Sequence, residues 1–205
     1  ELKTPVTILK GQLSGMLDGV GAYRDRDKYL LRSLQVAGRM ERLIGEMLAI
    51  SRMETGSAEV RRERVDLSAL LDRRLMQDDE MFRLRGQRLI SDLTPGVSVA
   101  GDEAMLEKVV GCLLSNAALY SPEGAQVRVW CGRLESRPSF TVENSGAQIS
   151  ADALPHLFEP FYRAEGSRSR ATGGSGLGLY LVKMILERHG AECRLETRRK
   201  GCARQ

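Results

Sequence analysis

The chain has 205 residues, of which 42% are hydrophobic and 28% are charged, a composition typical of a globular protein of one or two domains. Its 31 basic and 27 acidic side chains leave a net charge of only +4, too small a surplus to indicate a nucleic-acid-binding protein. The sequence contains no apolar run near the ~20 residues that cross a bilayer, and no pattern of a signal peptide. We therefore expect a folded chain that neither enters a membrane nor binds nucleic acid.

The cysteines and histidines indicate neither a zinc site nor a catalytic centre. The four cysteines form no CxxC pair and have no histidine at a zinc-binding spacing. We expect reduced thiols, with Cys112 and Cys131 in the core. His156 and His189 are far apart in the sequence, and we expect both to have structural roles.

The first 56 residues have the pattern of two antiparallel helices. Steps of three and four separate the apolar residues of two helical seams, which are Leu2, Val6, Leu9, Leu13 and Met16, and then Leu30, Leu34, Ala37, Met40, Ile44 and Met47. Two helices leave apolar surface uncovered, so we expect two copies to form a four-helix bundle. The prediction is a homodimer through residues 1–54; the alternative is a hairpin packed on its own second domain.

A second domain is predicted over residues 62–205, after a linker that contains Gly56, Ser57 and the charged run 61–64. Its patterns mix helices and strands without a regular βαβ rhythm, so the chain as a whole is predicted to be α+β, with this domain an α/β sandwich of one mixed sheet covered on one face by helices. Helices are predicted over 68–83, 103–119 and from the glycines to 188, and strands over 88–93, 97–100, 126–134, 139–143 and 192–196.

Asn116 lies near the end of the predicted helix 103–119, just before Tyr120 and a Ser-Pro-Glu-Gly turn. Its side-chain oxygen is a hard ligand of the kind that Mg²⁺ takes together with waters and phosphate oxygens. Taken alone, such an asparagine is more often a helix cap or a surface residue. The magnesium interpretation therefore depends on the motifs that follow.

Asn144 ends a predicted strand and is followed by a turn at Gly146. A polar side chain fixed at a strand end can bond a purine edge, and a glycine lets the backbone approach the ring. An ordinary turn is the alternative.

Glycines alternate at Gly174, Gly176 and Gly178 and open directly into an amphipathic helical pattern. Backbone amides at the start of a helix can bind phosphate, although the spacing matches neither the dinucleotide fingerprint nor the P-loop. The preceding segment carries Arg163, Arg168 and Arg170, which can bind phosphates bidentately if the segment folds over them. Disordered surface arginines are the alternative.

Taken in order, the motifs ELKTP at the start, NAALY, NSGxxI, FEPFYR and GGSGLGL resemble those of sensor histidine kinases over nearly the whole chain. The GML…YRDRDKYL stretch is similar, more weakly, to vancomycin-resistance sensor kinases. The resemblance implies a dimerisation and phosphotransfer hairpin joined to a catalytic ATP-binding domain of the histidine kinase, gyrase and chaperone type. It also implies the cytoplasmic portion of a protein anchored in the inner or plasma membrane, with a response regulator receiver domain as its partner.

The resemblance also assigns roles to residues. It implies that Asn116 binds Mg²⁺, that Tyr120 stacks on the adenine of ATP, and that Asn144 and Gly146 contact the adenine. Arg163, Arg168 and Arg170 match positions that bind phosphates. Gly174, Gly176 and Gly178 match the glycine box, and Leu177 and Leu179 would pack beneath it.

In this family the phosphoacceptor histidine directly precedes the residue matched by Glu1, so we expect this chain as given to bind ATP without phosphorylating itself. The resemblance makes Glu1 the carboxylate that takes the histidine proton. Thr4 would lie one helical turn after that histidine and serve in dephosphorylation of the regulator.

Three positions depart from the family pattern. Asn144 replaces a frequent aspartate, Cys112 a frequent second asparagine, and Leu119 a frequent lysine or arginine. Losing one charge-assisted contact costs about 1.5 to 3 kcal/mol, so we expect weak ATP binding. Two alternatives follow: a nucleotide-binding pseudokinase that acts as a phosphatase or scaffold for a response regulator, and a gyrase-like or chaperone-like ATPase.

Overall fold

A computed structural model of the chain describes residues 2–56, 59–146, 149–164 and 174–197. Its contacts divide the chain into two compact units, Glu1–Thr55 and Gly56–Gln205. Among the residues described, none of the helices combines the length and the apolar character that a bilayer crossing requires.

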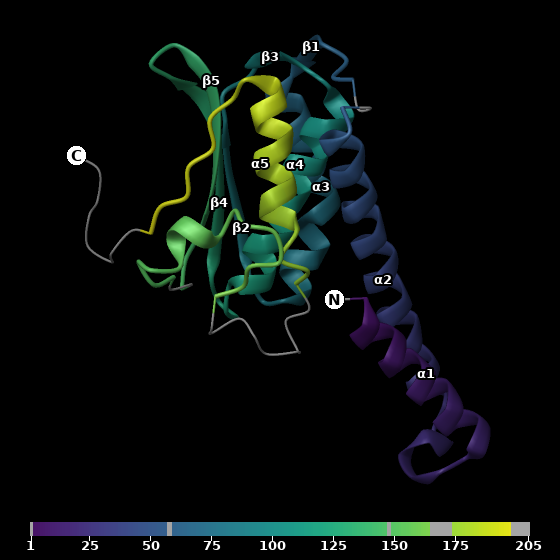
Figure 1. Ribbon diagram of the computed structural model, residues 1–205. Coiled ribbons are helices and arrows are strands. Elements are labelled where there is room, and N and C mark those ends of the chain that lie inside the picture. The colour runs from purple at the N-terminus through teal and green to yellow at the C-terminus, as the bar shows by residue number, and fades with distance from the viewer. Residues whose placement is uncertain (1, 57–58, 147–148, 165–173, 198–205) are drawn as a thin grey trace. The chain divides into compact units, whose positions relative to one another are not determined.

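The first unit is a helical hairpin (Figure 1). Its elements are α1 (Lys3–Asp18), the 3-10 turn η1 (Gly21–Arg24) and α2 (Arg26–Glu54). Helix α1 ends at Gly19, whose φ of 62° is left-handed and whose N–H donates to the carbonyl of Gly15. Helix α2 begins after Asp25, whose carboxylate accepts from the N–H of Lys28 at 3.2 Å. The glycine stop and the aspartate cap produce the predicted break between the two helices.

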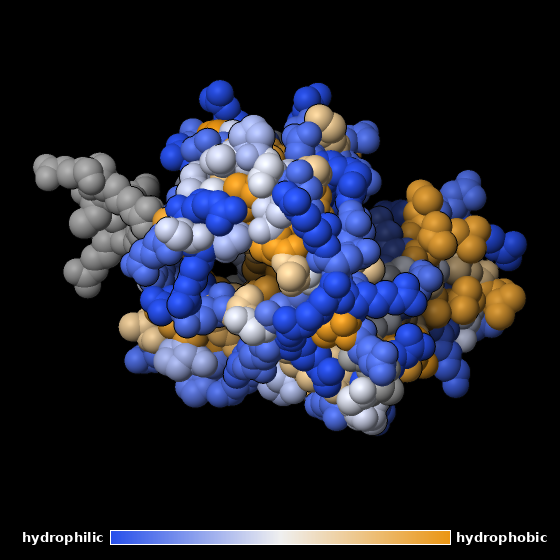
Figure 2. Space-filling model, turned by 90° about the horizontal axis from the view of Figure 1, so that it is seen from above, coloured by the Kyte–Doolittle hydropathy of each residue, from blue (hydrophilic) through white to orange (hydrophobic). Residues whose placement is uncertain are grey.

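The apolar seam predicted on the second helix is not the buried face of the hairpin. Leu43 is 5% exposed, whereas Leu34 is 71% and Ile44 is 43% exposed. A helix has room for two apolar stripes, and sequence periodicity alone does not say which one its neighbour covers. Figure 2 shows hydrophobic side chains gathered on the hairpin, at the right of the view. The exposed apolar residues of the hairpin are Val6, Ile8, Leu13, Leu17, Val20, Leu30, Leu31, Leu34, Ile44, Met47 and Leu48.

The second unit mixes helices and strands, as the sequence predicts. In chain order its elements are β1 (Glu63–Asp66), α3 (Leu67–Leu84), β2 (Arg88–Leu93), β3 (Ser98–Gly101), α4 (Glu103–Tyr120), β4 (Gln126–Leu134), β5 (Arg137–Asn144), the 3-10 turn η2 (Leu154–His156) and α5 (Gly178–His189). Helices α3 and α4 differ by at most one residue at each end from the predictions 68–83 and 103–119. Helix α5 ends at His189, one residue after its predicted end.

The strands form two sheets and not one. Strand β4 lies between β2, which is parallel to it, and β5, which is antiparallel to it. Strands β1 and β3 pair antiparallel in a separate two-stranded sheet, with Val65 opposite Val99. The mixed sheet is confirmed, whereas the prediction of a single sheet is wrong. Part of the charged run that is predicted as linker, residues 63–64, belongs to strand β1. The sequence does not reveal this strand, because its pairing partner β3 lies more than thirty residues further along the chain.

Helices α3, α4 and α5 cover one face of the three-stranded sheet (Figure 1). The core between them is formed by buried side chains that include Leu71, Phe82, Leu114, Val127 and Val129. Cys131 is fully buried in this core. Burial raises the pKa of its thiol above 9.0; a hydrogen bond with Ser68 opposes this shift, and the charge of Asp66 adds to it.

Residues 192–196 do not form the predicted strand. The described residues 191–197 follow α5 without strand pairing. The alternation of Cys193 and Leu195 with charged residues meets the pattern of a strand, but a strand exists only where a partner supplies its hydrogen bonds. Sequence periodicity does not reveal whether that partner is present.

Candidate functional site

Helix α4 carries the residues around which the candidate site is built. Val110 and Leu114 are fully buried on the side of the helix that packs into the core. Cys112, Asn116 and Tyr120 follow one another at a spacing of four, so they lie in a row along one side of the helix. Cys112 and Asn116 are half-buried, and Tyr120 is 37% exposed. This row is accessible to the segments that pack against α4.

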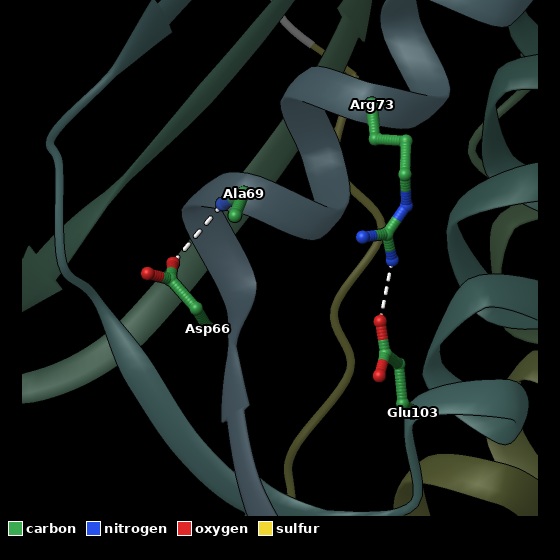
Figure 3. A network of polar contacts seen from close by, with 4 residues as sticks. All are labelled: Asp66, Ala69, Arg73 and Glu103. Carbon is green, nitrogen blue, oxygen red and sulfur yellow. Dashed lines mark hydrogen bonds and ion pairs between the residues drawn. The ribbon is translucent and has the colours of Figure 1, made fainter.

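The beginning of α4 is fixed to its neighbours. Asp102 caps the helix by accepting a hydrogen bond from the N–H of Met105 at 3.0 Å. The guanidinium of Arg73 on α3 forms an ion pair with Glu103 (Figure 3). Figure 3 also shows Asp66 in the same capping role at the start of α3. Two helices capped by aspartates are thus joined at the surface by an ion pair.

His189 joins the end of α5 to the start of α4. Its Nε2 accepts from the N–H of Asp102 at 3.0 Å, and its Nδ1 lies 2.7 Å from the carbonyl oxygen of Ile185. Because a backbone N–H donates and a carbonyl accepts, Nδ1 carries the proton of a neutral ring. The structural role predicted for His189 is confirmed. His156 is exposed and contacts Glu159.

The glycine segment, residues 174–178, lies along the row of Cys112, Asn116 and Tyr120 on α4. A Cβ at Gly174 would lie 2.8 Å from the hydroxyl of Tyr120, and a Cβ at Gly178 would lie 3.9 Å from the sulfur of Cys112. Since Asn116 is one helical turn from each of these residues, it is flanked on both sides by contacts with the glycine segment. Helix α5 begins at Gly178, as the sequence predicts.

The turn that follows the strand end at Asn144 approaches the residues just after α4. Asn144 is half-buried and closes β5 opposite Val127 of β4. Gly146 follows with a φ of 84°, and a Cβ there would lie 2.7 Å from the ring of Pro122. Pro122 follows α4 by two residues, so Gly146 lies beside the end of the helix that carries Asn116.

A backbone bridge ties the aromatic cluster of Phe158, Phe161 and Tyr162 to the glycine segment. The N–H of Phe161 donates to the carbonyl of Gly176 at 2.9 Å. Both residues have positive φ, 63° at Phe161 and 73° at Gly176, and a Cβ at Gly176 would lie 2.8 Å from the carbonyl carbon of Phe161. This close approach is open only to glycine. The bridge closes the base of the segment that contains the predicted phosphate-binding arginines.

The remaining residues predicted for the site differ in burial, and three of them lie outside the described residues. Arg163 is half-buried after the aromatic cluster, Leu177 is 2% exposed, and Leu179 is half-buried. Thr4 is exposed on α1 in the first unit. Glu1, Arg168 and Arg170 lie outside the described residues.

Sequence reasoning missed the residues that hold the end of α4. Gln87 is 6% exposed and donates through Nε2 to the carbonyls of Ala118 and Ser121. Arg85 donates to the carbonyl of Ala118 at 3.3 Å. A glutamine in the run Arg-Gly-Gln-Arg has the composition of a solvated turn, so the sequence carries no signal of this role.

Two cavities among the described residues lie elsewhere. One, of about 450 Å³, is lined by Arg61, Glu63, Asp102, Glu103, Ala104 and Glu107. The other, of about 460 Å³, is lined by Pro155, Phe158, Lys183, Leu186, Glu187 and residues 191–194. Within the described ranges, no three His, Cys, Asp or Glu side chains cluster as metal ligands.

Comparison with known protein families identifies both units. Residues 1–56 match the His Kinase A (phospho-acceptor) domain, and residues 101–204 match the family of histidine kinase-, DNA gyrase B- and HSP90-like ATPases. The chain belongs to the sensor histidine kinases. The fold and the family expected from the motifs are thus confirmed.

Curated relatives of this sensor histidine kinase are sensor proteins from bacteria. It is 31% identical to the sensor protein VanSB of Enterococcus faecalis over 201 residues, which are 98% of this chain and 45% of the relative. It is 34% identical to the histidine-protein kinase BaeS of Escherichia coli over 92% of this chain and 40% of the relative. The chain thus spans less than half the length of these relatives. Because the two identities are similar, they do not single out the vancomycin-resistance type.

Solved structures share the fold. The histidine kinase AdeS of Acinetobacter baumannii superposes with a TM-score of 0.75 at 24% identity, over 91% of this chain and 85% of that one. The histidine kinase ThkA, in complex with the response regulator protein TrrA, gives a TM-score of 0.65 at 19% identity, over 79% of this chain and 48% of that one. At these identities the likeness concerns the fold alone.

Proposed function

We propose that the second unit binds ATP along the exposed row of α4. The observation that carries the proposal is that two separated motifs meet α4 and its end: the glycine segment lies beside Tyr120 and Cys112, and Gly146, just after the Asn144 strand end, lies beside Pro122. In this proposal Tyr120, Asn144 and Gly146 contact the adenine. The phosphates lie at the glycine segment and the arginines, which comprise Gly174, Gly176, Gly178, Arg163, Arg168 and Arg170, with Leu177 and Leu179 packed beneath.

Asn116 would hold Mg²⁺ in this site. Its half-buried amide sits between the two glycine contacts, and a single protein oxygen suits an ion that keeps most of its waters and takes phosphate oxygens. Bound there, Mg²⁺ would neutralise charge on the phosphates. The amide itself brings no negative charge close to a polyphosphate.

The proposed activity is ATP-dependent phosphorylation of a histidine placed directly before Glu1 in the protein. The imidazole nitrogen attacks the γ-phosphorus, the bond from that phosphorus to the bridging oxygen of ADP breaks, and Glu1 takes the imidazole proton. The phosphoryl group then passes to an aspartate of a response regulator receiver domain. Thr4 would take part in the reverse task, dephosphorylation of that regulator. We further propose that this portion is cytoplasmic in a membrane-anchored protein, as in the family that it resembles.

We propose that the hairpin forms a homodimer through residues 1–54. Support comes from the apolar side chains left exposed on a single hairpin, among them Leu17 at 81% and Leu34 at 71% exposure. Contiguous apolar surface of this kind marks an interface in soluble proteins. A second hairpin would bury it in a four-helix bundle.

A pseudokinase that acts as a phosphatase or scaffold is the second candidate. Two apolar atoms favour it: the Cδ2 of Leu119 and the sulfur of Cys112 lie 3.4 Å and 3.9 Å from Cβ positions built on Gly174 and Gly178. Neither side chain can add a charge-assisted contact to a phosphate. They favour weak ATP binding, which a scaffold tolerates better than a kinase does.

One experiment separates the two candidates. The chain is extended by a histidine before Glu1 and by the residues that precede it in the protein, then incubated with Mg²⁺ and γ-labelled ATP. The kinase proposal expects an acid-labile, base-stable label, which is lost in a variant with alanine at the added histidine. Nucleotide binding without label would support the pseudokinase, and absence of nucleotide binding would refute both.

A further inference from the structure

Gln87 lies at the start of β2 and reaches the end of α4. Its side chain is almost completely buried, at 6% exposure. Its Nε2 donates to the carbonyl oxygen of Ala118 at 2.9 Å and to that of Ser121 at 2.7 Å. Ala118 lies in the last turn of α4 and Ser121 directly follows the helix, so no further backbone N–H of the helix is available to their carbonyls. The Gln87 amide therefore caps the end of α4, together with the guanidinium of Arg85, which donates to the same carbonyl of Ala118 at 3.3 Å.

The orientation of the Gln87 amide is fixed by its surroundings. Exchanging its oxygen and nitrogen would direct an acceptor at two carbonyl oxygens, so the nitrogen must face the helix. In this orientation Oε1 is buried without a hydrogen-bond partner among the described residues. A buried polar atom left in this way is rare and costly. The arrangement indicates that holding the helix end outweighs satisfying the second atom of the amide.

The backbone beside Gln87 docks on the same connection. The N–H of Gly124 donates to the carbonyl of Gly86 at 2.8 Å, and the N–H of Arg88 donates to the carbonyl of Ala125 at 2.9 Å. Residues 86–88 thus contact the whole connection from α4 to β4. The Gln87 side chain supplies the contacts at the helix end, and the backbone supplies those near the strand.

The held residues adjoin both sides of the proposed adenine contact. Ala118 precedes Tyr120 by two residues, and Ser121 follows it directly. Pro122 comes next and is the residue on which Gly146 packs, with a Cβ distance of 2.7 Å. A shift of this helix end would therefore move the Tyr120 ring relative to the turn at Gly146.

We infer that Gln87 is a positioning residue of the nucleotide site: its amide holds the last turn of α4 and the connection to β4, and so sets the adenine end of the site. This inference rests on the proposed function, because it presupposes that ATP binds at this row. Gln87 does not itself reach the ligand. Its loss should weaken adenine nucleotides equally, whatever the number of their phosphates.

The test measures binding of Mg²⁺-AMPPNP and of ADP by calorimetry in the full chain. Gln87→Met keeps the volume and removes both donors, and Gln77→Met is the matched control on the exposed surface of α3. We expect Gln87→Met to bind both nucleotides about tenfold more weakly, the size of one lost neutral hydrogen bond. Gln77→Met should bind like the unmodified chain. Circular dichroism confirms that each variant is folded at the temperature of measurement.

Gln87→Glu supplies a readout that a purely structural role would not move. An ionised carboxylate facing two carbonyls accepts nothing, whereas a protonated one donates one hydrogen bond. The affinity of the folded Glu variant should therefore recover as the pH falls from about 8 to about 6, more than that of the unmodified chain. This measurement also decides the question if Gln87→Met fails to fold.

The outcomes are distinguishable. If the unmodified chain binds AMPPNP and Gln87→Met binds it equally well, the positioning role is overturned and the proposed function stands. Loss of AMPPNP binding with unchanged ADP binding, or a Glu variant whose affinity follows the unmodified chain at every pH, also overturns it. If the unmodified chain binds neither nucleotide, the proposed function fails, and the inference fails with it.

Discussion

Gly176→Ala tests the proposed nucleotide site most directly. Gly176 has a φ of 73°, and its carbonyl accepts from the N–H of Phe161 at 2.9 Å. A Cβ at this position would meet the carbonyl carbon, Cα and carbonyl oxygen of Phe161 at 2.8, 2.9 and 3.1 Å. All three are backbone atoms, which cannot rotate away as a flexible side chain can. The two segments must therefore separate.

The expected cost has two parts. An L-residue in the left-handed region costs roughly 1–2 kcal/mol. Loss of the hydrogen bond between Phe161 and Gly176 adds about 0.5–1.5 kcal/mol. The sum is roughly 1.5–3.5 kcal/mol. Because this bridge joins Phe161 to Gly176 outside the main core, the cost should fall on the placement of the glycines along α4.

Calorimetric titration with Mg²⁺-AMPPNP measures the effect. If binding requires this placement of the glycines, Gly176→Ala should weaken affinity roughly tenfold to several hundredfold. The matched control is Gly190→Ala at the end of α5. Gly190 has a φ of 68° but no atom within 4 Å of its Cβ position. It should lose roughly 1–2 kcal/mol of unfolding free energy and keep its nucleotide affinity.

A Gly176→Ala affinity within about twofold of the unmodified chain would refute the reasoning, since the bridge would then be irrelevant to binding. Equal affinity losses in both glycine variants would also contradict it. That result would show that left-handed strain anywhere near α5 has the same effect. The close backbone contact at Phe161 would then explain nothing.

Three further predictions concern other parts of the chain. Leu119→Lys, beside Gly174, should tighten Mg²⁺-AMPPNP binding about tenfold by adding a charge-assisted contact, whereas the control Leu119→Met should not. Equal affinities of the Lys and Met variants would place the phosphates elsewhere. Leu34→Glu should make a dimeric chain monomeric in analytical ultracentrifugation. The control Leu84→Glu, at a similarly exposed position of the second unit, should leave the mass of the dimer unchanged. A dimer in both variants would argue against the hairpin interface. Because burial raises the pKa of Cys131 above 9.0, the folded chain keeps a proton that the unfolded chain releases, so the free energy of unfolding should fall as the pH rises through 9.0. Urea titrations should show a smaller fall in Cys131→Ala, and an identical pH dependence would contradict the assigned cause.

Local signals in the sequence predicted most of the elements. Capping aspartates and glycine stops, such as Asp102 and Gly190, punctuate the helices, and these signals act within one turn of the chain. The sequence gives no such signal for strand β1, because three of its four residues are charged and its partner β3 lies far along the chain. The segment 192–196 gave a false one, because alternation does not guarantee a partner.

The site divides in the same way. Asn116, Asn144 and the alternating glycines could be singled out because their residue types suit metal, purine and phosphate contacts at those positions. Gln87 could not be, because its role depends on two carbonyl oxygens that lie more than thirty residues further along the chain. A buried amide and a solvated one look alike in a sequence.

The sequence by itself determined the helices of both units, most of the strands, the family and the chemical types of the candidate ligand contacts, all of which follow from short-range patterns. Only the tertiary structure decided that the glycine segment lies along the Cys112–Asn116–Tyr120 row, that Gly176 contacts the backbone of Phe161, and that a glutamine holds the helix end. Those contacts join residues far apart in the chain. Packing of the core sets them, and no local pattern encodes the result.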